Sequence, residues 1–208
     1  MYDYQLTTLP NGVRIASERM PGVRSAALGI WVTTGSREEK ASESGAAHFI
    51  EHMLFKGTPT CSAGELAKRM DAIGGQINAF TTKELTCFHG RCLDTHLREA
   101  LSILCDMFFD SAFSEVDVES ERGVILEEIG MYADDPSDLV SEKLSAAVFH
   151  GTPLGRPILG RKATLDKMTG AWLKEYKQSH YTADRIIITL AGSFTDEIVD
   201  EIRARFSV

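Results

Sequence analysis

The sequence predicts an α+β fold, a mostly antiparallel sheet with helices packed on one of its faces. Strand-like segments occur at both ends of the chain, and helix-like segments cluster between them. The sequence contains no low-complexity run and no short repeat of the period typical of solenoids. Of the 208 residues, 43% are hydrophobic, which is enough apolar material to bury a core in one domain over residues 1–208.

The first third of the chain predicts a hairpin, a strand and a helix. Asn11-Gly12 separates two strand-like segments, and this pair tolerates the positive φ angles of a tight hairpin turn. Residues 25–36 are apolar on both alternating faces, which favours a central strand that is covered on both sides. Residues 44–56 are expected to be helical, and Gly57 is expected to end that helix.

The next segments predict a helix and a second hairpin. Ser62, with Glu65 three residues later, forms a capping box, so a helix should begin there and end at the following Gly-Gly pair. Two strands should then follow over 76–82 and 85–92.

The remaining segments predict mainly helices, separated by polar or Gly/Pro-rich breaks. Ser114 is a candidate cap for the longest helix, which should end before Pro136. The elements expected after the second hairpin are helices over 95–111, 115–135 and 138–150, a loop over 151–160, a helix over 164–181, a strand over 185–193 and a helix over 195–205.

Charge and composition exclude several classes of partner. Lys and Arg number 22 against 30 Asp and Glu, and the resulting net charge of −8 provides no basic surface for nucleic acid or an anionic membrane. No signal peptide and no apolar run long enough for a membrane span is found, so a cytoplasmic protein is expected. The four cysteines form no C-x-x-C pair and are expected to be reduced, buried thiols.

The stretch "GAAHFIEHMLFKGT" places two histidines one helical turn apart in an apolar setting. On a helix, His48 and His52 lie about 40° apart, so both imidazoles can reach one metal ion. Glu51 lies at the same edge, where a carboxylate can accept a proton from water. The spacing alone leaves a metal site and ordinary packing histidines about equally supported. Catalytic zinc normally has three protein ligands, so a third must come from elsewhere.

The helix "ESERGVILEEIG" offers candidates for that third ligand. Glu121 and Glu128 are seven residues apart, which returns them to nearly the same face after two turns. Glu127 is the alternative ligand, although it lies about 100° from Glu128 around the helix axis. Because these acids share the helix with apolar residues, at least one should face inward, where a metal cation would offset the cost of burial. The spacing favours Glu128 as the ligand and Glu121 as its neighbour.

The sequence resembles the pitrilysin, insulin-degrading enzyme and mitochondrial processing peptidase family of zinc metallopeptidases, whose inverzincin signature is H-x-x-E-H. It is most similar to processing-peptidase-type bacterial members. Blocks that resemble the family occur in the family's order along nearly the whole chain. They are "LPNGVRIASE", "GAAHFIEHMLFKGT", "GGQINAFTTKELTCFHG", "ESERGVILEEIGMYADDPSD", "PLGRPILG" and "HYTADRIIITLAGSF".

The resemblance implies one zinc ion per chain, held by His48, His52 and Glu128. It also implies that Glu51 activates water and that Glu121, the family's additional acidic residue, orients the site. The resemblance further implies that Asn78, Ala79 and Phe80 bind the substrate. This segment resembles the family's edge strand, which pairs with an extended peptide.

These implications predict a zinc-dependent endopeptidase that hydrolyses peptides or unfolded or precursor polypeptides. Family members usually carry a second, similarly folded half without the zinc motif, in cis or as a partner chain, and the chain is expected to be the zinc-bearing N-terminal half. A non-catalytic assembly or interaction subunit of the same fold is the alternative. A structural zinc domain would need four protein ligands, usually including cysteine. The roles of His89 and Arg156 stay open.

Overall fold

Six strands form one sheet in the computed structural model, which describes residues 3–207. The strand order is β1-β2-β8-β3-β7-β6. Neighbouring strands are antiparallel except for β2 and β8, which are parallel, so the predicted mostly antiparallel sheet is confirmed. The strands are β1 Asp3–Thr8, β2 Arg14–Arg19, β3 Ser25–Val32, β6 Gln76–Thr81, β7 Thr86–Leu93 and β8 Ile186–Gly192.

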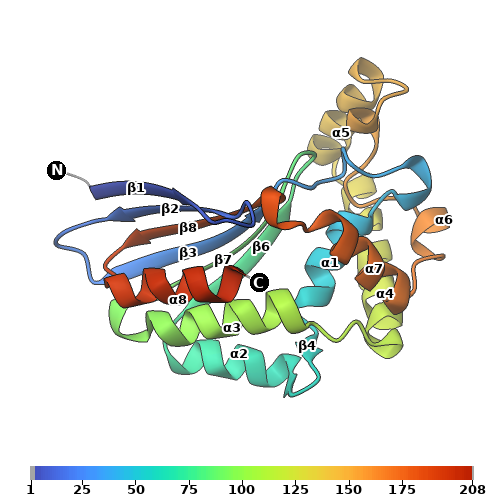
Figure 1. Ribbon diagram of the computed structural model, residues 1–208. Helices are drawn as coiled ribbons and strands as arrows, with labels where there is room; N and C mark the ends of the chain where they lie inside the picture. The colour runs from blue at the N-terminus through green and yellow to red at the C-terminus, as the bar shows by residue number, and fades with distance from the viewer. Residues whose placement is uncertain (1–2, 208) are drawn as a thin grey trace.

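The helices form two groups around this sheet. Figure 1 shows α8, α3 and α2 along one face, whereas α1, α4 and α7 lie together at one end of the sheet and α5 projects from the body. The helices are α1 Ala46–Leu54, α2 Ala63–Ala72, α3 Leu97–Asp110, α4 Glu115–Asp134, α5 Pro136–Val148, α6 Lys162–Leu165, α7 Gly170–His180 and α8 Asp196–Phe206.

The core lies between the sheet and the helices on its covered face. Strand β8 alternates buried and half-buried residues, as expected for a sheet with one helix-covered face. Strand β3 is central, but the expectation that both of its faces are covered was wrong. Ile30 and Val32 are fully buried on the helix side, whereas Ala27 is exposed on the opposite side. The reason is that α2, α3 and α8 all pack on the same side of the sheet (Figure 1).

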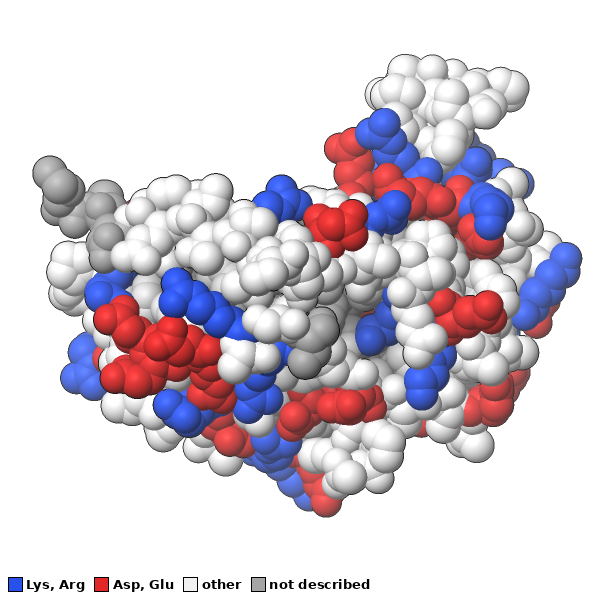
Figure 2. All heavy atoms as spheres, in the orientation of Figure 1, with Lys and Arg blue, Asp and Glu red and all other residues white. Residues whose placement is uncertain are grey.

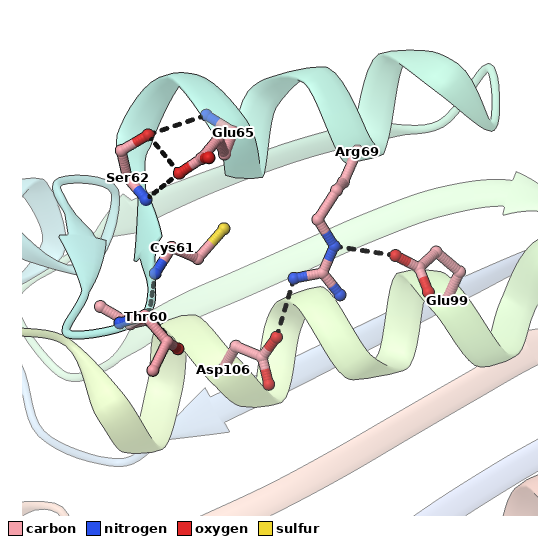
Figure 3. Close-up of polar contacts among 8 residues, drawn as sticks. Thr60, Cys61, Ser62, Glu65, Arg69, Glu99 and Asp106 are labelled. Atoms are coloured by element: carbon pink, nitrogen blue, oxygen red, sulfur yellow. Dashed lines mark hydrogen bonds and ion pairs between the residues drawn. The ribbon is translucent and has the colours of Figure 1, made fainter.

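Helices α2 and α3 are held together by charged side chains at their outer surface (Figure 3). Ser62 accepts the Glu65 N–H, and Glu65 accepts the Ser62 N–H in return, so the predicted capping box is confirmed. Arg69 of α2 donates to Glu99 at 2.9 Å and to Asp106 at 3.0 Å, both on α3. These contacts hold α2 against α3 on the helix-covered face of the sheet.

The start of the long helix α4 also follows the prediction. The Ser114 hydroxyl accepts the Asp117 N–H at 3.2 Å, and the helix runs to Asp134. Asp135 then caps α5, which begins two residues earlier than predicted because Pro136 occupies its first turn.

The single helix expected over 164–181 was wrong, because the chain forms α6 and α7 with a break between them. Thr169 caps α7 by accepting the Trp172 N–H at 3.2 Å. Arg122 of α4 donates to the carbonyl groups of Leu165 and Met168, so the broken helix has bonding partners for these groups. The local hydrophobic pattern predicts neither the Thr169 cap nor the bonds from Arg122.

The cysteines and the surface agree with the composition. All four cysteines are free, and three of them are buried. Acidic and basic side chains are interspersed on the face shown in Figure 2, with no continuous basic stripe. In residues 3–207, no helix combines the length and the apolar character that crossing a bilayer requires.

Candidate metal centre

The two histidines of α1 face the carboxylates of α4. His48 and His52 lie with ring centroids 4.6 Å apart. The Nε2 atoms of both rings are 3.7 Å from Oε2 of Glu128. One ligand atom from each of the three residues lies within 4.8 Å of the other two. The structure therefore brings together the three residues that the sequence proposed as ligands.

This cluster fits a catalytic zinc ion in both donor type and number. Two imidazole nitrogens and one carboxylate oxygen form a His₂Glu set, which leaves one position open for water or substrate. Oε2 of Glu128 is buried and has no hydrogen-bond partner among the described residues, and a cation would offset the cost of burying it. Glu127, the alternative ligand, is exposed and lies outside the cluster.

The surroundings of the two imidazoles favour metal binding. Burial, together with the neighbouring His52, lowers the pKa of His48 to about 3, so its ring is neutral at pH 7 and keeps a lone pair. His52 Nδ1 lies 3.0 Å from Oε2 of Glu121. If Nδ1 carries the proton, it donates to this carboxylate and leaves the Nε2 lone pair directed at Glu128 and the metal position.

Glu121 lies behind His52 and contacts it directly. Only 5% of Glu121 is exposed, and its other oxygen is 2.5 Å from Nζ of Lys56. The buried carboxylate is thus paired with a cation and bonded to a ring nitrogen, which is how such a charge is tolerated. Glu121 fixes the orientation of the imidazole and does not line the cleft.

Glu51 faces the cleft next to the ligands, where a general base would be needed. The Thr81 hydroxyl of β6 donates to Oε2 of Glu51 at 2.5 Å. Burial raises the pKa of Glu51, and the Thr81 bond acts in the opposite direction by stabilising the carboxylate. The net effect is a raised pKa, which makes this carboxylate a stronger base than an exposed one.

The cleft itself lies between α1, β6, α4 and α5. Its volume is about 500 Å³, and His48, Glu51 and Glu128 form one of its walls. Asp138 and Glu142 of α5 line the opposite wall, so the cleft is strongly acidic.

Strand β6 is the edge strand beside this cleft, because it stands last in the strand order. Ala79 and Phe80 line the cleft. Asn78 accepts the Ala79 N–H through its own side chain at 2.9 Å. Phe80 packs against Trp31 and His89, with ring centroids 5.8 Å and 6.0 Å away, so His89 is a packing residue outside the metal cluster.

Two residues of the site were missed by the sequence reasoning. Lys56 lies four residues after His52, two residues past the end of α1, and this spacing could have identified it. Thr81 gave no comparable signal, because its partner Glu51 is thirty residues away in the sequence. Only the packing of β6 against α1 brings the two together.

Comparison with known families gives one match over most of the chain. The model described as "Insulinase (Peptidase family M16)" matches residues 14–162. A Bacillus subtilis protein named as an uncharacterized zinc protease, YmxG, is 47% identical over 199 residues, which cover 96% of this chain and 49% of that protein. A probable mitochondrial-processing peptidase subunit beta of Arabidopsis thaliana is 38% identical over 98% of this chain and 38% of its own length. The chain spans about half the length of most of the curated relatives that it matches.

Solved structures show the same fold in about half of longer chains. The chain is similar to a protease from Helicobacter pylori, with a TM-score of 0.91 and 22% identity, over all of this chain and 50% of that one. The first half of the periplasmic protease PqqL from Escherichia coli matches with a TM-score of 0.87 and 25% identity, over 98% of this chain and 46% of that one. A domain from Pseudomonas fluorescens described as inactive matches with a TM-score of 0.90 and 18% identity, so the fold alone does not determine activity.

We expect the chain to bind one zinc ion and the variant His52→Ala to lose it, because two remaining ligands make a weak site. The affinity should fall by more than about 100-fold, since loss of an outer-shell partner alone costs about 10–100-fold. Metal analysis after dialysis measures the stoichiometry. His89→Ala is the matched control and should keep the parent's zinc content. Equal zinc in the two variants would contradict the assignment of His52.

Proposed function

Because this chain belongs to the insulinase family of peptidases (peptidase family M16), we propose that it is the zinc-bearing half of a zinc-dependent endopeptidase. The observation that carries the proposal is the cluster of His48, His52 and Glu128, which lies at a cleft that the carboxylate of Glu51 also lines. A domain that only supports assembly has no need of this complete set. The named zinc proteases among the relatives support the same class of activity.

Residues of this chain would carry out the proton transfers of the reaction. When bound, zinc supplies Lewis-acid polarisation of the scissile carbonyl and of the attacking water. Glu51 takes the proton from that water and later returns it to the leaving amine. Thr81 holds the carboxylate in position through its 2.5 Å hydrogen bond. Glu121 keeps the His52 ring oriented while charge develops at the site.

The substrate would bind as an additional strand on β6. The outer edge of β6 offers main-chain groups that pair with an extended peptide of nearly any sequence. A bound peptide would have to replace the Asn78 side chain at the Ala79 N–H. The acidic wall formed by Asp138 and Glu142 would favour peptides with basic side chains at the position that faces α5.

A second half is part of this proposal, because the chain matches about half of its curated relatives and of its structural neighbours. We expect weak peptide cleavage by the 208-residue chain alone, since the substrate contacts from a second half would be missing. Supplying the second half of the Bacillus subtilis relative should raise the cleavage rate of a fluorogenic peptide library. Rapid cleavage by the monomeric chain alone would contradict this expectation.

The variant Glu51→Gln tests the assignment of the base. It should keep zinc, because Glu51 is not a ligand, and it should lower kcat by about 10²–10⁴-fold, the usual contribution of general acid–base catalysis. Peptide cleavage is measured together with metal content. Glu127→Gln, an exposed carboxylate beside a ligand, is the matched control and should cleave at the parent's rate. If the zinc-loaded Glu51→Gln variant turned over normally, Glu51 would not be the base. A zinc-loaded parent that cleaves no peptide with the second half present would favour the assembly subunit.

The variant Thr81→Val tests how the base is tuned. The Thr81 hydrogen bond lowers the pKa of Glu51, so its loss should raise that pKa further. Glu51 would then stay protonated to higher pH, and the acidic limb of kcat/KM should move upward while the alkaline limb stays in place. The measurement is a pH profile of peptide cleavage at saturating zinc. An acidic limb at the parent's position would show that Thr81 does not tune the base.

A further inference from the structure

The helix that carries both histidines has no capping side chain of its own. Its N-cap residue is Gly45, which has a positive φ of 100° and cannot accept a hydrogen bond through a side chain. The free N–H groups of Gly45 and Ala47 instead donate to Oε2 and Oε1 of Glu39, each at 2.9 Å. A carboxylate six residues upstream therefore caps α1 with both of its oxygens.

Glu39 performs this role from inside the protein. Only 2% of the residue is exposed, and burial raises the pKa of its carboxyl group to about 8, against the two backbone hydrogen bonds and the nearby Arg156, which lower it. An exposed Ser, Asp or Asn at the N-cap would stabilise the helix without this cost. A buried carboxylate that accepts two N–H groups fixes the direction of the first turn more tightly than a single-oxygen cap can.

Arg156 connects this cap to the substrate side of the cleft. Its guanidinium donates to the backbone carbonyl of Glu39, and its own carbonyl accepts a hydrogen bond from Lys83. Lys83 lies in the turn between β6 and β7 and lines the cleft. A continuous set of contacts thus leads from the β6 hairpin, through Arg156 and Glu39, to the start of α1.

The backbone leaves α1 little freedom to shift at this end. A Cβ atom on Gly45 would lie 2.9 Å from the Cα of Gly160, and one on Gly160 would lie 2.4 Å from the carbonyl oxygen of Ser44. The loop that follows Arg156 therefore packs directly on the first turn of the helix. The Glu39 cap and this loop together therefore hold the first turn of α1 in place.

We propose that Glu39 is a positioning residue of the metal site, which acts through the backbone of α1 to set His48 and Glu51 relative to β6. His48 follows Ala47 directly, so any rotation of the first turn moves its ring. The inference rests on the proposed function. It adds to the proposed site a residue that acts on the metal ligands only through the backbone of α1. Arg156 extends the same action to the β6 hairpin.

The variant Glu39→Gln tests this role, because it keeps the size of the side chain while turning one acceptor into an N–H₂ donor that faces a backbone N–H. We expect zinc affinity to fall about tenfold, at the low end of the range for outer-shell partners, and the absorption bands of the cobalt-substituted chain to shift. Glu43→Gln is the matched control. Glu43 undergoes the same change of carboxyl to amide four residues away, but its side chain bonds only Lys40 and should leave both readouts unchanged.

The thermal unfolding of the metal-free chain separates a positioning role from a purely stabilising one. Glu39→Gln leaves a buried N–H₂ group facing a backbone N–H, so the unfolding midpoint should fall, and the cobalt bands should shift together with it. A lower midpoint with unchanged bands and zinc affinity would overturn the proposal. If Glu39→Gln does not fold, Arg156→Met decides, because methionine cannot donate a hydrogen bond to the Glu39 carbonyl. Shifted cobalt bands would then support the proposal, and unchanged bands would overturn it.

These readouts also separate this inference from the proposed function. If the zinc-loaded parent cleaves no peptide even with a second half present, the proposed function fails, and the cobalt spectra still decide the role of Glu39. If the parent cleaves peptide and Glu39→Gln shows the parent's spectrum and kcat, the inference alone fails. In the supporting case, Glu39→Gln lowers kcat more than it changes KM, because β6, which holds the substrate, is intact.

Discussion

The pairing of buried polar groups between α1 and α4 is the constraint on which the rest of this site depends. A buried imidazole or carboxylate without a partner is costly, so each such group needs a neighbour of suitable charge or hydrogen-bonding type. Glu121 meets this need with Lys56 and His52. His48 and Glu128 point at each other across a short gap in which a divalent cation would complete the pairing.

The surrounding fold places these groups beside the edge strand that is proposed to bind the substrate. The six-stranded sheet ends at β6, and the packing of α1 against this edge places Glu51 against Thr81. The proposed general base and the strand proposed to hold the peptide are therefore joined by a single hydrogen bond. Helix α5 closes the opposite wall with acidic residues and leaves Val140 and Leu144 on its outer surface, 62% and 64% exposed.

At the start of α1, a carboxyl group is buried at an energetic cost and accepts hydrogen bonds from the backbone of the helix. Glu39 is buried and accepts two of the free N–H groups at the start of the helix, those of Gly45 and Ala47. Arg156, whose role the sequence left open, contacts Glu39 through the backbone and lies away from the metal ligands. The residues that direct the helix and the residues that bind the metal are thus different sets, on different segments of the chain.

The sequence by itself determined the elements and the contacts that lie within one element. The helical period placed His48, Glu51 and His52 on neighbouring positions of one face, and the same period favoured Glu128 over the exposed Glu127. Most helix starts were also readable, because capping depends on residues two or three positions apart, as at Ser62 and Ser114.

Only the tertiary structure decided the contacts between distant segments. The Thr81 bond to Glu51, the Lys56 pair with Glu121, the Glu39 cap of α1 and the division of the expected helix over 164–181 all depend on how separate elements pack. A local hydrophobic pattern states which face of a helix is buried, and it carries no information on which side chain of another element that face will meet. The pairing of charges in this site is therefore a property of the packed molecule.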